Sequence, residues 1–518
     1  MATVGTEERP KTDTERLHEL GYAQELLRKM SGFSNFAVSF TIISILSGCL
    51  TLYQYGMNTG GPVVMSIGWP LVGVMVLMVG LSMAEIASAY PTAGGLYYWS
   101  AKLANKNGPA WSWFTGWFNV LGQVGVTAGI DFGLAFFVTA FLSLQFGYGT
   151  DAINVIAVYA VVLAIHGLLN TFGVRLVALL NNVSVWWHIV GVLVIVGALA
   201  FIPAHHQSLS YVFGHFVNNQ GWTGPIAGLY VFALGLLLAQ YTFTGYDASA
   251  HMTEETQNAA RSAPRGIVMS IVVSLIAGWV LLLGVTFAIQ DYNKEVAALV
   301  PPAQIFIDAI GSTGGKLLLL IVIGAQFFCG MSSVTANSRM IYAFSRDGAL
   351  PLSNFWHRVN KRTRTPTNSI WLAAVGAFIL GLPYLTSKAG NTEAYAAVTS
   401  IATIGLYIAY ILPVILRLRA GDRFQRGPWH LGSYSTIIGV IATIWVAFIV
   451  ILFMLPPTNP VNLATNFNYA PVAVAVVLLI AGGWWFASAR NWFKGPRVQG
   501  SPDELAAIER ELTDAGAA

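Results

Sequence analysis

Long apolar runs separated by short polar loops constrain this chain more than any other feature of its sequence. A helix needs about 20 mostly apolar residues to cross the hydrocarbon core of a bilayer. In lipid a helix also satisfies all of its own backbone polar groups. The sequence therefore predicts an all-α integral membrane protein with twelve transmembrane helices. They are expected at about 35–57, 68–90, 112–143, 151–171, 183–203, 225–250, 265–289, 315–345, 370–385, 394–416, 436–455 and 470–490.

The composition excludes a soluble protein. Only 10% of the 518 residues are charged and 55% are hydrophobic, and the mean hydropathy is +0.62. Soluble globular chains carry roughly 25% charged residues. Cys49 and Cys329 both lie inside apolar segments, so a disulfide framework is not expected. The N-terminus has no cleavable signal pattern.

The distribution of lysine and arginine predicts the topology. With alternate loops assigned to opposite sides, 24 of the 27 basic residues fall on the side that holds both termini. The exceptions are Lys294, Lys316 and Lys388. Positive charge accumulates on the cytoplasmic side of membrane proteins. We therefore expect a multi-pass protein of the cell membrane with both termini in the cytoplasm. Residues 1–34 and 491–518 are expected to be solvated tails, with a short surface helix after Ser501.

Two of the predicted spans are interrupted by polar and small residues. Span 1 carries "SILSGC", with Ser44, Ser47 and Gly48 in mid-membrane, and span 6 reads "LLLAQYTFTGYDASA". They lie five spans apart, and paired interruptions of this kind indicate a transporter site built from an inverted repeat. The free N–H and C=O groups of a broken helix can hold charged groups. We expect a first repeat at 35–203, a second at 225–416, and additional helices at 436–490.

The acidic residue at the span-6 interruption needs its own explanation. Asp247 would lie at the start of the second half of the broken helix, where its carboxylate can cap free N–H groups. Gly245 would relax the backbone there. A role as cap is the favoured interpretation for Asp247, and a role in transport or gating is the alternative.

A short helix that lies over the external face is also expected within 291–314.

Four stretches of the sequence resemble the amino acid–polyamine–organocation superfamily of permeases. They are "TGGP" (59–62), "GLSMAEIASAYPTAGGLYYWSAKLA" (80–104), "FTGYDASAHMTEETQNAARSAPRGI" (243–267) and "SRMIYAFSRDGALP" (338–351). The second is similar to the amino acid/choline transporter branch, which includes γ-aminobutyrate and choline permeases. The resemblance implies the leucine-transporter fold, with spans 1–5 and 6–10 as inverted repeats and spans 11 and 12 appended. Substrate would lie between the two breaks.

The resemblance also implies a set of substrate-binding residues. The family's Gly-Ser-Gly motif in span 1 is matched by Leu46, Ser47 and Gly48, and Leu46 departs from it. This departure would allow a substrate without an ordinary α-amino acid head. The aromatic-Gly-aromatic-acidic pattern of span 6 is matched from Phe243 to Asp247. The substrate-binding residues implied are Leu46, Ser47, Gly48, Cys49, Tyr241, Phe243, Thr244, Gly245 and Tyr246.

A histidine in span 5 is the candidate for proton coupling. Many proton-coupled members of the superfamily carry a lysine in this helix, and the matching position here is His188. An ionisable group in the membrane is a functional hypothesis by default, and imidazole exchanges protons near neutral pH. The alternatives are a structural histidine, or sodium coupling through the oxygens of Ser332 and Ser333 in span 8.

Other intramembrane charges have structural and functional interpretations. Glu85, at the end of span 2, is expected to pair with a basic residue or to move with an inner gate. Asp131, in mid-span 3, either attracts an amine or is itself paired or protonated. Trp117 and Tyr407, together with the aromatic residues of span 6, would offer ring faces to the cationic group of a substrate. A possible gate cluster on the cytoplasmic side consists of Glu254, Glu255, Arg261, Arg265, Arg339 and Arg346.

These features favour a secondary active transporter over other classes of membrane protein. A membrane enzyme would need clustered ligand or catalytic side chains, and the only close pair, His205–His206, has no acidic companion. A substrate sensor would carry long extensions. We expect an importer of amino acids or small amines and a proton symporter, with no catalytic residue, cofactor, metal or nucleic acid partner. Sodium coupling, exchange and a permease-like sensor are the alternatives.

Overall fold

The structure is a computed structural model that describes residues 12–172, 174–386, 393–462 and 467–517. That part of the chain contains helices and no strand. Eleven of its helices are long and apolar enough to cross a membrane. They are α2 (Gly32–Ile43) continued by α3 (Ile45–Thr51), α5 (Trp69–Ala89), α7 (Gly108–Phe146), α8 (Ala152–Phe172), α9 (Val174–Phe201), α14 (Ala259–Phe287), α16 (Pro301–Arg346), α18 (Thr367–Gly381), α19 (Glu393–Ala420), α20 (Ser435–Leu452) and α21 (Ala470–Trp484).

The segment predicted as span 6 is not one of these eleven helices. It is divided into α11 (Ala227–Gly235), α12 (Leu237–Thr242) and α13 (Ala248–His251). The first span is also divided, because Ser44 separates α2 from α3 in a left-handed conformation. Both predicted interruptions are therefore present in the fold.

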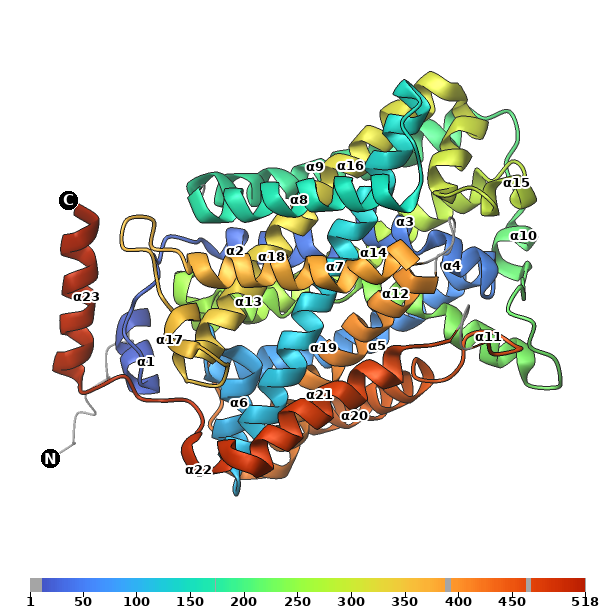
Figure 1. Ribbon diagram of the computed structural model, residues 1–518. Coiled ribbons are helices and arrows are strands. Elements are labelled where there is room, and N and C mark those ends of the chain that lie inside the picture. The colour runs from blue at the N-terminus through green and yellow to red at the C-terminus, as the bar shows by residue number, and fades with distance from the viewer. Residues whose placement is uncertain (1–11, 173, 387–392, 463–466, 518) are drawn as a thin grey trace, which may run out of the picture.

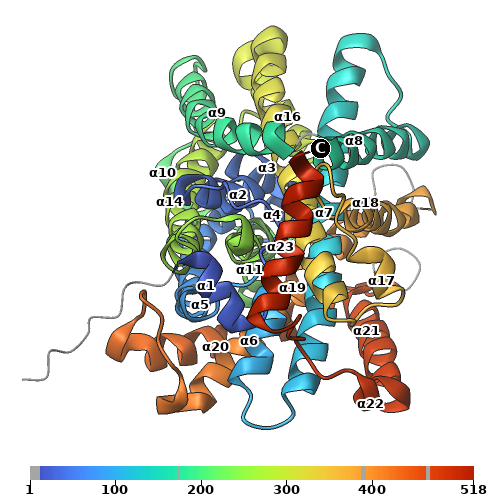
Figure 2. The same cartoon turned by 90° about the vertical axis from the view of Figure 1, so that its left-hand side faces the viewer.

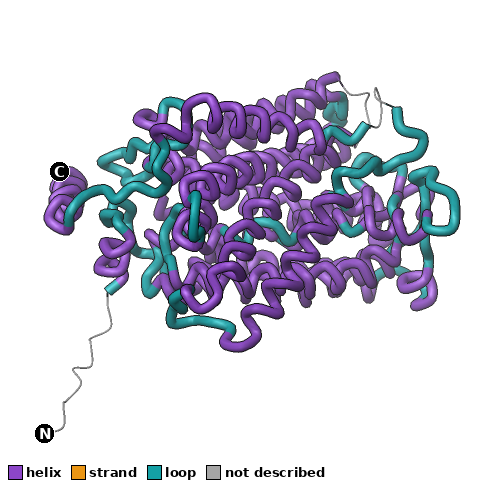
Figure 3. Tube along the Cα trace, turned by 90° about the horizontal axis from the view of Figure 1, so that it is seen from below, coloured by secondary structure: helices purple, strands orange, loops and turns teal. Residues whose placement is uncertain are grey.

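The helices run side by side and form a bundle with loops gathered at its two ends (Figures 1 and 3). One end, here called the termini face, holds α1 (Asp13–Leu20), α17 (Ser353–Trp356) and α23 (Pro502–Ala517). The other end, here called the opposite face, holds α4 (Tyr53–Asn58), α10 (Leu209–Gly214) and α15 (Tyr292–Val296). The remaining short helices are α6 (Gly95–Leu103) and α22 (Arg490–Trp492).

The helix α7 lies at the centre of the bundle and packs against α16, α19, α6, α8 and α18. Glycines bring its backbone close to α19. A Cβ at Gly122 would lie 2.6 Å from Leu406 N, and one at Gly125 would lie 3.0 Å from Ala402 Cα. Small residues allow such close approach of helices in membranes. In a second group, α14 packs against both α5 and α2.

The expected short helix within 291–314 is confirmed in form. The segment contains α15 and the first turns of α16, which bends at Gly311 with a non-helical backbone (φ 80°). Tyr292 Oη donates a hydrogen bond to the carbonyl of Met57, and Gln54 Nε2 donates to the carbonyls of Val296 and Ala298. This segment therefore covers the end of the first span.

The expectation of a solvated tail is wrong for the described part of the N-terminal segment, whereas most described residues after Arg497 are exposed or half-buried. Leu17, Tyr22 and Leu26 are buried, because the N-terminal segment packs into the termini face. The predicted C-terminal helix is present as α23, and it lies beside this segment (Figure 2). His18 Nε2 lies 2.8 Å from Glu509 Oε1. The two ends of the chain therefore cover the same face of the bundle.

Candidate binding site at the helix breaks

The first break is centred on Ser44, which has φ 40° and ψ 80°. A non-glycine residue in this left-handed region is strained by roughly 1–2 kcal/mol. Downstream of it, the backbone N–H groups of Ile45 and Leu46 have no acceptor within the described residues. Upstream, the carbonyl of Ile42 accepts a hydrogen bond from Cys329 Sγ at 3.1 Å. The break therefore leaves two N–H donors free and ties its carbonyl end to α16.

His188 holds the break from the side. Its Nε2 lies 2.7 Å from Ser44 Oγ, and its Nδ1 lies 2.7 Å from the carbonyl of Ser184. The backbone carbonyl can only accept, so we assign the proton to Nδ1, and Nε2 then accepts from the Ser44 hydroxyl. The imidazole is completely buried. The structure thus places the predicted coupling residue directly against the first break.

The second break follows α12. Residues 243–247 form a turn in which Gly245 has φ 97°. A Cβ at this position would lie 2.2 Å from Ile42 Cγ2, so the turn requires glycine both for its conformation and for its contact with the first break. The N–H of Gly245 donates to Tyr410 Oη at 3.3 Å.

A small cavity, here called the break cavity, lies between the two breaks. It measures about 10 Å³, which is room for a single water molecule. Four of the predicted substrate-binding residues line this cavity, namely Ser47, Gly48, Tyr241 and Thr244. The lining residues are Ile42, Ile43, Ser47, Gly48, Thr51, Ile130, Tyr241, Thr242, Thr244 and Cys329. Occupancy by an amino acid therefore requires the two breaks to separate from the conformation seen here.

The other predicted substrate-binding residues point elsewhere in this conformation. Leu46 faces α9, where a Cβ at Gly191 would lie 2.7 Å from its Cδ1. The ring of Phe243 packs on Trp69 at 4.5 Å, and that of Tyr246 packs on Tyr410 at 5.0 Å. Cys49 is buried outside the lining, and Gly245 contacts Ile42. Trp117 packs among other tryptophans, and Tyr407 packs on Tyr410.

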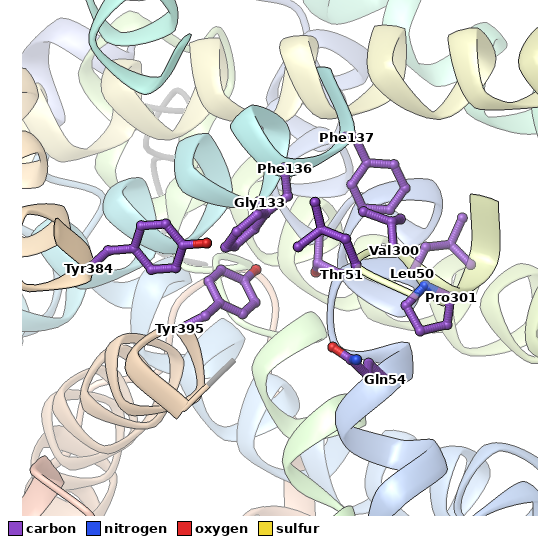
Figure 4. A pocket seen from close by; sticks show the side chains of 11 residues that line it. Leu50, Thr51, Gln54, Gly133, Phe136, Phe137, Val300, Pro301, Tyr384 and Tyr395 are labelled. Carbon is purple, nitrogen blue, oxygen red and sulfur yellow. The ribbon is translucent and has the colours of Figure 1, made fainter. Parts of the chain in front are cut away.

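A second cavity, here called the upper cavity, adjoins the break cavity, and its lining is shown in Figure 4. Thr51 lines both cavities. Figure 4 shows Tyr384 and Tyr395 on one side of it, and Val300 and Pro301 on the other. The complete lining is Leu50, Thr51, Gln54, Gly133, Phe136, Phe137, Leu299, Val300, Pro301, Tyr384 and Tyr395. Val300 and Pro301 belong to the segment that covers the end of the first span, so the upper cavity lies between that segment and the break cavity.

Asp247 occupies the predicted position at the start of α13, but the expectation that its side chain caps this helix is wrong. The carboxylate makes no capping hydrogen bond. It accepts from Tyr410 Oη and from Gln123 Nε2, both at 2.7 Å, and lies 3.2 Å from His251 Nε2. These partners come from α19, α7 and α13 itself. Asp247 therefore ties the second break to the surrounding helices.

Two buried ion pairs lie beyond the second break. Arg346 Nη2 lies 3.0 Å from Glu254 Oε1, and Arg339 Nε lies 2.8 Å from Glu255 Oε1. The Arg346 guanidinium also lies 4.0 Å from the ring centroid of Tyr22, in the N-terminal segment. Of the predicted gate cluster, the structure pairs these four residues, whereas Arg261 and Arg265 are exposed. The two ion pairs therefore join the segment after α13 to α16.

The other intramembrane residues singled out in the sequence lie close to polar side chains of neighbouring helices. Glu85 pairs with Arg417, with Nε and Oε2 3.3 Å apart, which confirms the expected basic partner. Asp131 pairs with His166, with Oδ1 and Nδ1 3.1 Å apart. Ser332 Oγ donates to Asn181 Oδ1, and Ser333 Oγ lies 2.8 Å from Thr127 Oγ1. Neither serine lines the break cavity.

Some lining residues were missed by sequence reasoning. Ile130 and Cys329 belong to α7 and α16, which show no interruption in the sequence at these positions. The only local signal is a neighbouring glycine: a Cβ at Gly129 would lie 2.4 Å from Tyr241 Oη. His166 was also missed, because a single histidine in an apolar run does not indicate its partner.

Comparison with known proteins identifies relatives over nearly the whole chain. The sequence profile of the family described as "Amino acid permease" matches residues 30–480. The chain is 46% identical over 503 residues to "Amino-acid permease BAT1" of Arabidopsis thaliana, which covers 93% of this chain and 95% of the plant protein. It is 30% identical over 511 residues to the "GABA-specific permease" of Saccharomyces cerevisiae, which covers 95% of this chain and 87% of the yeast protein.

Proposed function

Because the chain belongs to the amino acid permease family, we propose that it is a secondary active transporter that imports an amino acid or small amine by alternating access. The substrate binds between the two breaks. The observation that carries this assignment is the break cavity, which is lined by residues of both interrupted segments and by α7 and α16. Irregular backbone at membrane depth is tolerated where it lines a cavity.

The proposed architecture counts the segment 225–250 as a sixth crossing, which makes twelve in all. Spans 1–5 and 6–10 then form inverted repeats, with α20 and α21 as additional helices. We assign the termini face to the cytoplasm and the protein to the cell membrane, because the basic residues accumulate on this side. The opposite face is then external, and the upper cavity is the external path.

Under this proposal, the inner side of the transporter is closed in the conformation seen here. The two buried ion pairs of the gate join the second break to α16, while Thr51 links the break cavity to the upper cavity. In the proposed cycle, substrate enters through the upper cavity and closes the breaks around it. The ion pairs then separate and release it to the cytoplasm.

The substrate class follows from the site and from the relatives. The free N–H groups of Ile45 and Leu46 suit a carboxylate, and the yeast relative is named for γ-aminobutyrate. Leu46 replaces a glycine of the superfamily motif and faces α9. We propose a substrate with a carboxylate and an amine, with γ-aminobutyrate among the first to test and choline as a carboxylate-free comparison.

Proton coupling through His188 fits the geometry of the first break. In the neutral imidazole, Nε2 accepts from the Ser44 hydroxyl. Once protonated, Nε2 donates to Ser44 Oγ, and the hydroxyl hydrogen becomes available to another acceptor. A substrate carboxylate near the break would supply that acceptor and would favour the protonated ring. Proton and substrate would then bind cooperatively, and the coupling would be reciprocal.

Sodium coupling receives less support from this arrangement. The oxygens of Ser332 and Ser333 are engaged by α9 and α7 rather than directed at the break. The group that reaches the Ile42 carbonyl is the thiol of Cys329, and sulfur is a poor ligand for a hard cation.

The test is uptake by the purified protein in liposomes. Radiolabelled γ-aminobutyrate, choline and a panel of amino acids are offered under an imposed pH gradient, then under a sodium gradient, with empty liposomes as the control. Accumulation of an amino acid under the pH gradient supports the proposal. Accumulation under the sodium gradient alone contradicts proton coupling.

A further inference from the structure

A buried carboxylate–imidazole pair lies behind the break cavity. Asp131 on α7 and His166 on α8 are completely buried, and their ion pair is 3.1 Å long. Neither carboxylate oxygen of Asp131 and neither ring nitrogen of His166 has a hydrogen-bond partner among the described residues. Buried polar side chains are nearly always satisfied, so a purely structural role explains the pair poorly.

The pair is connected to the break cavity through α7, which carries Asp131, and through α16, which packs against it. Ile130, which lines the break cavity, precedes Asp131 on α7. On α16, a Cβ at Gly330 would lie 1.8 Å from Asp131 Oδ1, so only glycine leaves room for the carboxylate. Gly330 follows Cys329, whose thiol donates to the carbonyl at the first break. Asp131 and the glycine that it contacts are therefore each next in the chain to a residue that lines the break cavity.

No neighbouring group compensates a change in the charge of the pair. The titratable groups that face Asp131 are Tyr159 on α8, Tyr241 on α12 and Cys329 on α16. The packed helix α18 carries no charged side chain. Among the described residues, no lysine or arginine forms an ion pair with either group. The pair has no net charge when it holds a proton on the imidazole, and a net negative charge without it.

We propose that the Asp131–His166 pair binds a second transported proton, in addition to the one assigned to His188 on α9. This inference rests on the proposed function of a proton-coupled importer. In the closed conformation, where both side chains are completely buried, a net charge is costly, so the pair holds its proton. When the breaks separate and water reaches α7 and α16, the unprotonated pair is solvated and the proton leaves.

A first experiment needs no substrate. Infrared difference spectra of the purified protein, recorded between about pH 5 and about pH 8, detect the ring and carboxylate vibrations of groups that change protonation in the range where imidazole titrates. We expect bands that disappear in both Asp131→Asn and His166→Gln and persist in His206→Gln, the control histidine. Difference spectra that are identical in all four proteins would overturn the proposal.

A second experiment measures coupling in liposomes, with the membrane potential clamped by potassium and valinomycin. One pH unit drives roughly tenfold accumulation for each coupled proton. Asp131→Asn is isosteric and keeps the pair uncharged with neutral His166, so it should retain exchange of labelled for unlabelled γ-aminobutyrate or amino acid. Its accumulation per pH unit should fall roughly tenfold below the wild type. Unchanged accumulation per pH unit overturns the inference.

The two experiments separate the inference from the function on which it rests. Absence of any transport by the wild-type protein counts against the proposed function, whereas the infrared bands of the pair do not depend on transport. A His206→Gln control that accumulates substrate like the wild type shows that histidine replacement as such does not uncouple the protein.

Discussion

Ser44 Oγ and His188 Nε2 lie 2.7 Å apart, and this contact joins the left-handed residue of the first break to the only ionisable side chain of α9 inside the bundle among the described residues. The strained backbone of Ser44 is held by a group that can exchange a proton. A change in the protonation of His188 therefore acts directly on the hydrogen bond to Ser44 at the first break.

The first prediction concerns this contact. His188→Ala removes the partner of the Ser44 hydroxyl and should lower pH-driven accumulation at least about tenfold per pH unit, while exchange of labelled for unlabelled substrate continues. The measurement compares accumulation and exchange in the same liposomes. Accumulation equal to the wild type would remove His188 from the coupling mechanism.

The second prediction concerns the turn of the second break. Gly245→Ala places a Cβ 2.2 Å from Ile42 Cγ2 at a backbone position with φ 97°. We expect transport to fall by at least about tenfold, equivalent to ~1.4 kcal/mol, because the two breaks can no longer approach each other. Gly197→Ala on α9 is the matched control, since a Cβ there meets nothing within 4 Å. Equal transport rates for the two variants would contradict this assignment.

The third prediction concerns the inner gate. Glu254→Gln leaves the buried guanidinium of Arg346 without its anion, and breaking a buried pair in this way costs about 3–5 kcal/mol. The variant should open more readily towards the termini face. Accessibility of a cysteine introduced at Tyr342, tested with a membrane-impermeant reagent in inside-out vesicles, should rise.

The control for the gate is the exposed pair of Lys361 and Glu511, whose side chains are 62% and 70% exposed. Exposed pairs are worth about 0–1 kcal/mol, so Glu511→Gln should leave the accessibility unchanged. A gate that is equally accessible in Glu254→Gln and in the wild type would show that the ion pair does not hold it closed.

The fourth prediction uses Glu295, in the segment that covers the opposite face. Burial raises the pKa of this carboxyl to about 7, from about 4.3 in an unfolded chain. The folded state favours the protonated form, so the stability from this group is complete below about pH 4 and is lost as the pH rises to about 7. Glu295→Gln should raise the thermal unfolding midpoint at about pH 8 and leave it nearly unchanged at about pH 4. The same midpoint for both proteins at about pH 8 would contradict the pKa assignment.

The sequence was sufficient to predict the breaks because helix interruption has a local cause. Ser44, Ser47 and Gly48 weaken a helix in an otherwise apolar run, and Gly245 accommodates a backbone that other residues resist. The same reasoning located Asp247 at the start of α13. It did not find the actual partners of Asp247, because Gln123 and Tyr410 lie more than a hundred residues away in the chain.

Contacts between distant helices account for the other differences. Ile130 and Cys329 line the break cavity because α7 and α16 pass beside both breaks, and no local pattern shows this. The N-terminal segment is polar overall, so the sequence indicated a solvated tail. Its few apolar residues, such as Leu17 and Tyr22, are buried because the termini face offers them a surface.

The most direct test of the account compares the wild-type protein with Ser47→Trp in liposomes under a pH gradient. Ser47 lines the break cavity, which has room for one water, and an indole there would fill the space that the substrate needs. We predict that the wild type accumulates γ-aminobutyrate or another amino acid of the panel, and that Ser47→Trp reaches the membrane in equal amount and accumulates none. Wild-type accumulation by Ser47→Trp would show that the substrate does not bind between the two breaks.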